Sequence, residues 1–205
     1  MTQDVPCRED SVVRFPGSAA LKSCVLSEDC SIQGIAFKKG SIVGFDEKGR
    51  LWRCNVSQDT AVDGLACRAG SEIEFFPNGL LQSCVLSVSA TIDGIQAAAG
   101  LLVMFHENGR LFKCDLDRAM TVQGYPVRKG TDICFFNDGR LSACWLAEDH
   151  QVDGVLCSSG TRVWLSRNGS LLAGTLRSGL KTGKSACATG SFAVFSEDGS
   201  LVHCG

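Results

Sequence analysis

Apolar residues recur along this chain at a fixed interval of thirty residues. Three columns of aliphatic or aromatic side chains run through almost the whole sequence. They are Val13, Val43, Ile73, Val103, Ile133 and Val163; Phe15, Phe45, Phe75, Phe105, Phe135, Leu165 and Phe195; and Leu26, Val56, Leu86, Leu116, Leu146 and Leu176. Around these columns apolar and polar positions alternate with the period of a strand, without the spacing of an amphipathic helix. The pattern predicts an all-β fold built from tandem repeats.

The thirty-residue period defines seven copies within one predicted repeat domain, residues 1–205. The copies cover approximately residues 3–32, 33–62, 63–92, 93–122, 123–152, 153–182 and 183–205. In such arrays each copy is one small unit of secondary structure, and neighbouring copies bury a common core between them.

Glycine marks two turns in most copies. One turn is Asp-Gly or Gln-Gly, as in Asp63-Gly64, and the other ends in Asn-Gly or Asp-Gly, as in Asn78-Gly79. These dipeptides favour the positive φ angles of tight turns, so each copy is predicted to be a β-hairpin. A further glycine column, which includes Gly70, lies in the middle of the predicted strands and predicts a kink there.

A two-residue turn at Asp63-Gly64 fixes which residues of its two strands face each other. It opposes apolar residues, namely Val62 with Leu65, Cys54 with Ile73, and Trp52 with Phe75. The same register places Asp29 opposite Lys38 and Asp59 opposite Arg68. Opposite charges that face each other across strands contribute roughly 0.2–1 kcal/mol.

Joined end to end, the hairpins predict an antiparallel meander of thirteen long strands and a C-terminal strand at residues 201–204. We expect this sheet to be elongated and bent at the mid-strand glycines. The alternative is a three-sided β-solenoid with one copy per coil, but it would stack like charges such as Asp29 and Asp59. A closed barrel of about fourteen strands would enclose a lumen too wide for these side chains to fill.

The turn motif resembles the MORN (membrane occupation and recognition nexus) repeat family, whose members form β-hairpin arrays. The resemblance lies in the pattern aromatic-x-x-(Asn/Asp)-Gly-x-Leu, as in residues 75–81 (FFPNGLL) and 105–111 (FHENGRL). It implies a scaffold or interaction module instead of an enzyme. It is also the sole ground for considering a membrane-surface module.

The charge of the chain does not favour nucleic acid as a partner. Its 205 residues include 20 basic and 22 acidic side chains, with a formal net charge of −2 and no run of Lys or Arg. Phosphate backbones attract strongly basic surfaces. No stretch approaches the roughly 20 apolar residues of a membrane-spanning helix, and the first residues carry no charged-then-apolar leader. We therefore expect no transmembrane segment and a cytoplasmic protein.

The twelve cysteines fall largely into two columns of the repeat. One column holds Cys24, Cys54, Cys84, Cys114, Cys144 and Cys204, and the other holds Cys67, Cys157 and Cys187, with Phe37, Ala97 and Val127 at equivalent positions. Replacement of the thiol by apolar residues is typical of a small buried hydrophobe. Cysteines of one column lie two strands apart, about 9–10 Å, which is farther than a disulfide spans. The pattern predicts reduced thiols, no metal site and no cofactor.

The three histidines, His106, His150 and His203, do not form an arrangement typical of nucleophilic catalysis. His106 is predicted in a turn, and His203 points away from its neighbour Cys204 because successive strand residues alternate. His150 is expected on the inner face, as a hydrogen-bonded structural residue. We predict no catalytic residue, although an enzymatic function stays open.

The outward face of the predicted sheet changes character along the chain. One row of facing residues reads Ser23, Gly44, Arg53, Glu74, Ser83 and then Met104, Lys113, Cys134, Ala143, Trp164, Ala173, Val194. The next row places Trp145 beside Arg162, with Phe192 farther along. Tryptophan, methionine and arginine together are typical of a binding hot spot. The candidate partner-binding residues are therefore Met104, Cys134, Trp145, Arg162 and Trp164, unless another layer or the bend of the sheet covers them.

Asp115 and Asp132 are predicted to face each other on this outer surface, where like charges are destabilising. Lys113 and Arg162 are placed to relieve them. The two aspartates are a candidate acidic pair, and a local register slip is the alternative.

The leading functional hypothesis is a non-catalytic scaffold that binds a protein partner or a second copy of itself. The first alternative is a ligand-binding or enzymatic cleft in the bend of the sheet, with Asp115 and Asp132 as candidate groups. The second alternative is the membrane-surface module that the family resemblance implies.

Overall fold

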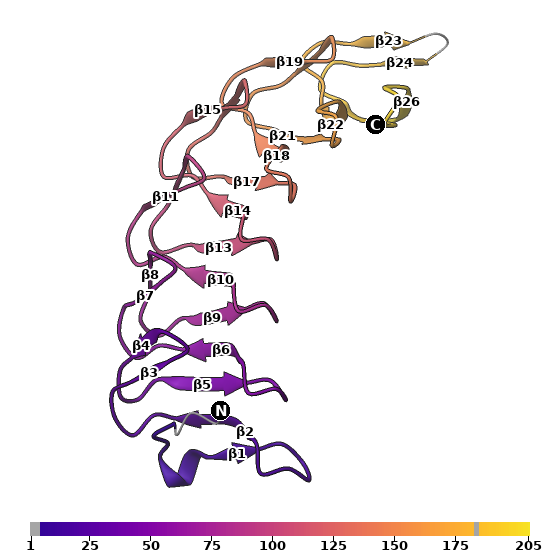
Figure 1. Ribbon diagram of the computed structural model, residues 1–205. Coiled ribbons are helices and arrows are strands. Elements are labelled where there is room, and N and C mark those ends of the chain that lie inside the picture. The colour runs from indigo at the N-terminus through magenta and orange to yellow at the C-terminus, as the bar shows by residue number, and fades with distance from the viewer. Residues whose placement is uncertain (1–4, 183–184) are drawn as a thin grey trace. The chain divides into compact units, whose positions relative to one another are not determined.

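A computed structural model describes residues 5–182 and 185–205 and confirms the predicted all-β fold. One antiparallel sheet has fourteen strands, and consecutive hairpins follow one another along it in chain order (Figure 1). Six further sheets have two strands each. The alternative of a parallel-stacked solenoid is wrong, because successive strands pair antiparallel. Among the described residues, no helix has the length and apolar character needed to cross a membrane.

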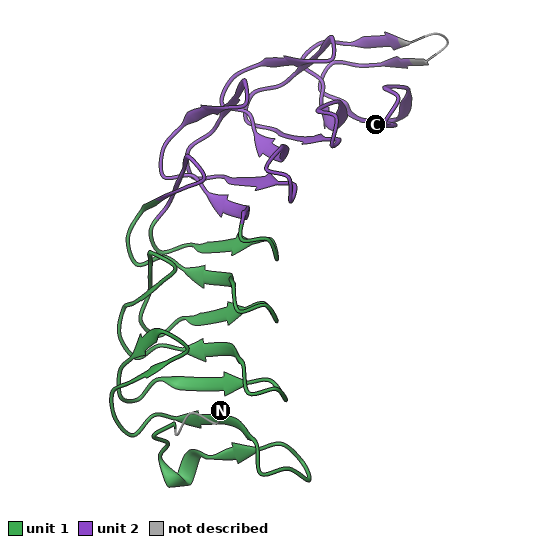
Figure 2. Ribbon diagram, viewed as in Figure 1, with its two compact units in different colours: residues 1–90, 99–109 green, residues 91–98, 110–205 purple. Residues whose placement is uncertain are grey.

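The chain divides into two compact units (Figure 2). Unit 1 comprises Met1–Ala90 and Ala99–Gly109, and unit 2 comprises Thr91–Ala98 and Arg110–Gly205. The predicted copy boundaries at residues 3 and 183 lie outside the described residues. The single repeat domain predicted from the sequence stays a prediction.

Unit 1 contains a short 3-10 helix, seven strands of the large sheet and two pairs of short strands. The helix is η1 (Glu9–Ser11), and the strands of the large sheet are β1 (Val13–Arg14), β2 (Leu21–Val25), β5 (Ile42–Phe45), β6 (Leu51–Asn55), β9 (Glu72–Phe75), β10 (Leu81–Val85) and β13 (Leu102–Phe105). The short pairs are β3 (Cys30–Ile32) with β4 (Ile35–Phe37), and β7 (Thr60–Val62) with β8 (Leu65–Cys67).

Unit 2 follows the same plan. Its strands of the large sheet are β14 (Leu111–Asp115), β17 (Asp132–Phe135), β18 (Leu141–Trp145), β21 (Arg162–Leu165), β22 (Leu171–Thr175), β25 (Phe192–Phe195) and β26 (Leu201–Cys204). The short strands are β12 (Ile95–Ala97), β15 (Met120–Val122), β16 (Tyr125–Val127), β19 (His150–Val152), β20 (Val155–Cys157), β23 (Leu180–Thr182) and β24 (Ser185–Cys187). The remaining strand, β11 (Ala90–Ile92), begins at the last residue of the first segment of unit 1.

Each predicted long strand is divided in two, because the chain leaves the large sheet in the middle of the copy. For example, β6 belongs to the large sheet, whereas β7 pairs with β8 in a small hairpin. At the kink Gly70 has a φ of 73°, and its amide donates to the Val56 carbonyl at 2.7 Å. The positive φ explains glycine in this column. Asp63 (φ 48°) and Gly64 (φ 79°) close the small hairpin, as predicted.

The inner register predicted from the Asp63-Gly64 turn is confirmed where the small hairpin and the large sheet pair. Val62 faces Leu65 in the small hairpin, and Cys54 faces Ile73 in the large sheet. Val62, Cys54 and Ile73 are buried. Apart from Val13, which is exposed at the N-terminal end, the apolar columns of the repeat therefore supply most of the core of each unit.

The predicted position of Trp52 on the inner face is wrong, because a β-bulge changes the register. Gly44 faces Arg53, but the next pair is Phe45 with Leu51, so Trp52 is an extra residue between them. Leu51 is buried, whereas Trp52 is 38% exposed. The same irregularity recurs between β9 and β10, β17 and β18, and β21 and β22. A bulge of this kind turns one side chain per copy toward the other face.

The aspartates near the kink serve mainly as hydrogen-bond acceptors for backbone amides. The predicted ion pair between Asp29 and Lys38 is present, with Oδ2 and Nζ 2.7 Å apart, but it is exposed and contributes little. Asp29 also accepts a hydrogen bond from the Lys39 amide at 2.9 Å. Asp59 accepts the corresponding bond from the Ala69 amide at 2.7 Å. The acidic residue in this column thus satisfies a backbone donor at the kink.

Two disulfides are present, so the prediction that all cysteines are reduced is wrong. Cys7 is bridged to Cys24 and Cys187 to Cys204, with Cα atoms 5.7 Å and 5.9 Å apart. The strand spacing keeps cysteines of the same column apart, whereas the bridge between β24 and β26 joins different columns. The other eight cysteines are unbridged. Burial raises the pKa of Cys114 and of Cys144 to about 12, as suits buried hydrophobes.

Candidate functional site

The outer face of the large sheet in unit 2 carries four of the five candidate partner-binding residues. They are Cys134 on β17, Trp145 on β18, and Arg162 and Trp164 on β21. The predicted rows are confirmed in this unit, because Ala143 faces both Cys134 and Trp164, and Trp145 faces Arg162. The strand register therefore brings two tryptophans and an arginine together.

The carboxylate of Asp132 is the centre of a network on this face. Its oxygens accept hydrogen bonds from the indole Nε1 of Trp145 at 2.9 Å and from Nη1 of Arg162 at 2.8 Å. Nζ of Lys113 lies 3.2 Å away. Burial alone would raise the pKa of Asp132, but the bond from Trp145 and the charges of Arg162 and Lys113 outweigh it and lower the pKa. Asp132 is thus held as an ionised, fully engaged carboxylate.

Asp115 faces Asp132 as predicted. The pairing of β14 with β17 is regular at this point, so the alternative of a register slip is wrong. The main-chain carbonyl of Asp115 accepts a hydrogen bond from the Ala98 amide at 2.9 Å. Because Asp132 is neutralised by Lys113 and Arg162, the repulsion that opposed aspartates would suffer is relieved. Within residues 5–182 and 185–205, no group of three or more His, Cys, Asp or Glu residues is arranged to hold a metal ion.

Arg162 links the network to an exposed aromatic pair. Its Nη2 lies 3.3 Å from the sulfur of Cys134, and its guanidinium carbon lies 5.4 Å from the ring centroid of Trp164. Trp164 meets Phe192 edge to face, with centroids 5.8 Å apart and an interplanar angle of 88°. A geometry of this kind is favourable for aromatic rings, and a cation near a tryptophan ring is attracted to it.

We define the Trp164 patch as Arg162, Trp164 and Phe192. Trp164 is 38% exposed and Phe192 is 39% exposed. Cys134, by contrast, is buried next to the guanidinium, and burial raises the pKa of its thiol. The buried Nε of Arg162 lacks a hydrogen-bond partner in the part of the chain that the structure describes, which costs free energy. The sheet therefore presents the rings of Trp164 and Phe192 to solvent beside the Arg162 guanidinium, which Asp132 holds in place.

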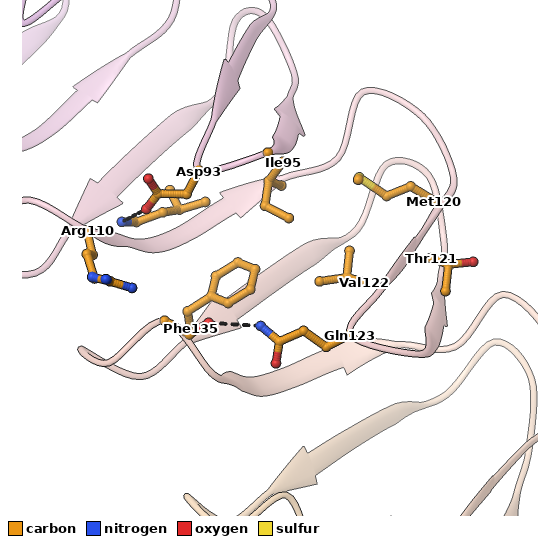
Figure 3. Close-up of a pocket in the computed structure, with 11 residues that line it drawn as sticks. Asp93, Ile95, Arg110, Met120, Thr121, Val122, Gln123 and Phe135 are labelled. Atoms are coloured by element: carbon orange, nitrogen blue, oxygen red, sulfur yellow. Dashed lines mark hydrogen bonds between the residues drawn. The ribbon is translucent and has the colours of Figure 1, made fainter.

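A cavity of about 550 Å³ lies elsewhere in unit 2 (Figure 3). Its walls include Ile95, Met120, Val122 and Phe135, with polar side chains from Asp93, Arg110 and Gln123. Asp93 accepts a hydrogen bond from the Leu111 amide at 3.0 Å, and Gln123 donates to the Gly139 carbonyl at 2.9 Å. The candidate pair Asp115 and Asp132 does not line this cavity.

The polar groups of this cavity have equivalents in other copies. Gln33 donates to the Gly49 carbonyl at 3.1 Å, and Asp153 accepts from the Leu171 amide at 2.8 Å. These bonds tie the tip of a small hairpin to the strand that follows. The recurrence favours a structural role for Asp93 and Gln123.

Unit 1 carries the fifth candidate, Met104, and an exposed tryptophan, Trp52, that strict alternation places in the core. Met104 lies on β13, where it faces Ser83 as predicted. Trp52 lies beside Arg53, whose guanidinium carbon is 4.5 Å from the indole centroid. Trp52 also lines a groove of about 440 Å³ together with Phe45 and Phe75.

Trp52 was missed because strict alternation assigns it to the core. A signal for the bulge is nevertheless present in the sequence. Leucine recurs one residue before the bulge position, at Leu51, Leu81, Leu111, Leu141, Leu171 and Leu201. A leucine column next to a variable column is what a recurrent bulge produces, because the leucine takes the buried place.

Comparisons with known proteins add no family to this description. No protein-family model matches the chain, and a search of curated proteins gives no match. The resemblance to MORN repeats stays a prediction.

Proposed function

We propose that this protein is a non-catalytic repeat scaffold that binds a protein partner through the Trp164 patch. The observation that carries the proposal is the exposed edge-to-face pair of Trp164 and Phe192, with Arg162 held beside it. Tryptophan and arginine are enriched among residues that dominate binding energy. The charge of Arg162 is already balanced by Asp132, so the patch is suited to an apolar anchor of the partner, surrounded by polar groups.

The network behind the patch supports this proposal, because it fixes the orientation of Arg162 before any partner arrives. Arg162 and Asp132 have side chains that are 22% and 15% exposed, and their charged atoms are 2.8 Å apart. A residue that is already ordered loses little conformational entropy on binding. The patch is therefore preorganised.

The chemistry of the other candidate groups supports a non-catalytic function. Asp132 is engaged by three donors. His150, expected to be structural, packs against Tyr125 with ring centroids 5.1 Å apart. A general base needs access to a proton of its substrate, and the oxygens of Asp132 are already occupied by these donors.

The test compares proteins that co-purify with the wild type and with two matched variants. Trp52→Ala in unit 1 is the control for Trp164→Ala, because both tryptophans are 38% exposed and both lie beside an arginine. We expect Trp164→Ala to lose the bound protein and Trp52→Ala to keep it. Sedimentation of the purified variants decides whether the bound protein is a second copy. An unchanged set of bound proteins in a folded Trp164→Ala variant would contradict the proposal.

A second candidate is a small-molecule site in the cavity of Figure 3. Its volume of about 550 Å³ lies within the range of known ligand pockets. A ligand that binds the folded form selectively raises the thermal midpoint. Phe135→Ala should abolish the shift produced by such a ligand, whereas a shift retained in this variant would locate the ligand elsewhere.

A further inference from the structure

Three pairs of cysteines in this chain are separated by seventeen residues. They are Cys7 with Cys24, Cys67 with Cys84, and Cys187 with Cys204. The first and third pairs are disulfides. The second pair lies in unit 1 at positions exactly two copies after the first, and its cysteines are unbridged.

The backbone around Cys67 and Cys84 repeats the backbone around Cys7 and Cys24. In the bridged pair, the Arg8 amide donates to the Val25 carbonyl at 2.9 Å. Sixty residues later, the Arg68 amide donates to the Val85 carbonyl at 2.8 Å. The same correspondence relates the antiparallel bridges of Cys7 with Leu26 and of Cys67 with Leu86.

A second backbone bond repeats in the same way, from the Ser27 amide to the Pro6 carbonyl at 2.9 Å and from the Ser87 amide to the Ala66 carbonyl at 2.8 Å. Two matching backbone hydrogen bonds and one matching bridge place the two Cα atoms of each pair alike. The Cα distance of 5.7 Å in the bridged pair is within the range that disulfides require.

The side chains of Cys67 and Cys84 also meet. The two thiols share a hydrogen bond, and both are fully buried. This bond and burial raise the pKa of Cys84, whereas the same bond lowers the pKa of Cys67. Both thiols are fully buried, so an external disulfide does not reach either of them once β8 has packed against β10. Cys67 and Cys84 can therefore react with an external disulfide during folding, before β8 packs against β10.

We propose that Cys67 and Cys84 form a third disulfide of this protein, made during folding by exchange with a low-molecular-weight disulfide such as oxidised glutathione. The thiolate of one cysteine attacks the external disulfide and releases one thiol. The second cysteine then displaces the other thiol and closes the bridge. Two protein thiols are oxidised, one external disulfide is reduced to two thiols, and the two protons end on those thiols.

A third disulfide bears on the cellular compartment in which this protein folds. Stable disulfides are typical of oxidising compartments and rare in the cytosol. The cytoplasmic location expected from the sequence stays a prediction, and three bridges would weigh against it.

The test maps the cysteines of the full chain after refolding with reduced and oxidised glutathione. Free thiols are alkylated in denaturant, and the chain is cleaved after acidic residues without reduction. Cleavage at Asp59, Asp63 and Glu72 separates Cys67 from Cys54 and Cys84. We expect a cross-linked peptide that joins Cys67 to Cys84 and disappears on reduction, while Cys54 is recovered alkylated. Recovery of Cys67 and Cys84 as alkylated peptides would overturn the proposal, whether or not the end pairs are bridged.

A designed bridge provides a positive control for the geometry. Gly174 holds the place of the partner of Cys157, and a Cβ atom built on Gly174 lies 3.2 Å from the Cys157 sulfur. The Gly174→Cys variant should therefore gain a cross-linked peptide that the wild type lacks. Its appearance without the Cys67–Cys84 peptide would show that the method detects such bridges and that the proposal is wrong.

Discussion

Units 1 and 2 each carry a tryptophan beside an arginine, but the two arginines are held differently. Arg53 in unit 1 pairs with Glu72 at 3.5 Å, and the side chains are 52% and 53% exposed. Arg162 in unit 2 pairs with Asp132 at 2.8 Å in a partly buried network. Solvent screens the first pair, whereas the second is supported by Trp145 and Lys113. The same repeat thus yields an aromatic surface with an exposed ion pair in one unit and one with a partly buried ion-pair network in the other.

The largest difference should appear when the acid of each pair is removed. Asp132→Ala leaves Arg162 and Lys113 unbalanced and the Trp145 indole without its acceptor, so we expect a loss of about 2–3 kcal/mol in the free energy of unfolding. Glu72→Ala in unit 1 should cost less than about 1 kcal/mol, because its ion pair is exposed. Urea denaturation measures both. Equal losses would remove the distinction between the units.

The second-largest difference is expected in partner binding, which should depend on Trp164 and not on Trp52. Truncation of a hot-spot residue costs about 2 kcal/mol, so Trp164→Ala should weaken the Kd for the protein partner about thirtyfold. Trp52→Ala should leave the Kd within about twofold, since residues outside a hot spot contribute little. Titration calorimetry with the identified partner provides the measurement. A similar weakening in both variants would mean that the partner does not distinguish the patches.

Two glycines allow a comparison of packing in the two units. A Cβ atom on Gly174 would lie 3.2 Å from Cys157 and 3.3 Å from Val163, both buried, so Gly174→Ala should cost about 1–2 kcal/mol of stability through overpacking. On Gly44 the Cβ atom would meet the side chains of Arg53 and Trp52, which are free to move into solvent. Gly44→Ala should therefore change the unfolding free energy little. A larger loss for Gly44→Ala would show that Trp52 is more firmly held than its exposure indicates.

The smallest expected effect is the loss of the Asp132 contribution to stability at acidic pH. The pKa of Asp132 is lowered in the folded protein, so its contribution is complete above the unfolded aspartate pKa of about 3.9 and is lost as the pH falls through the folded value. The stability difference between the wild type and Asp132→Asn should shrink between pH 7 and pH 3, as measured by urea midpoints. A difference as large at pH 3 as at pH 7 would argue that the carboxylate charge is not what stabilises the network.

Local turn chemistry made the repeat and its inner register predictable. Asp63-Gly64 closes one type of turn, and that turn alone sets Cys54 against Ile73. The pairing of Trp145 with Arg162 follows from the same rule applied to a later copy. These features depend on residues near each other in sequence, which is why alternation and glycine positions were sufficient.

Features that depend on packing between layers could not be predicted in this way. The bulge that exposes Trp52 adds one residue per copy, and strict alternation does not account for it. The bridge between Cys187 and Cys204 requires a small hairpin to lie on the large sheet, whereas strand spacing describes a single sheet. The engagement of Asp132 by Trp145 depends on side-chain conformations that a register does not specify.

Photo-crosslinking from within the Trp164 patch tests most directly whether the patch contacts a protein partner. A benzoylphenylalanine at position 192 lies beside Trp164, and the same group at position 52 serves as the control in unit 1. We predict one discrete cross-linked protein from position 192, lost when Trp164→Ala is added, and none from position 52. A cross-link of equal yield from position 52, or its absence from position 192, would contradict the account.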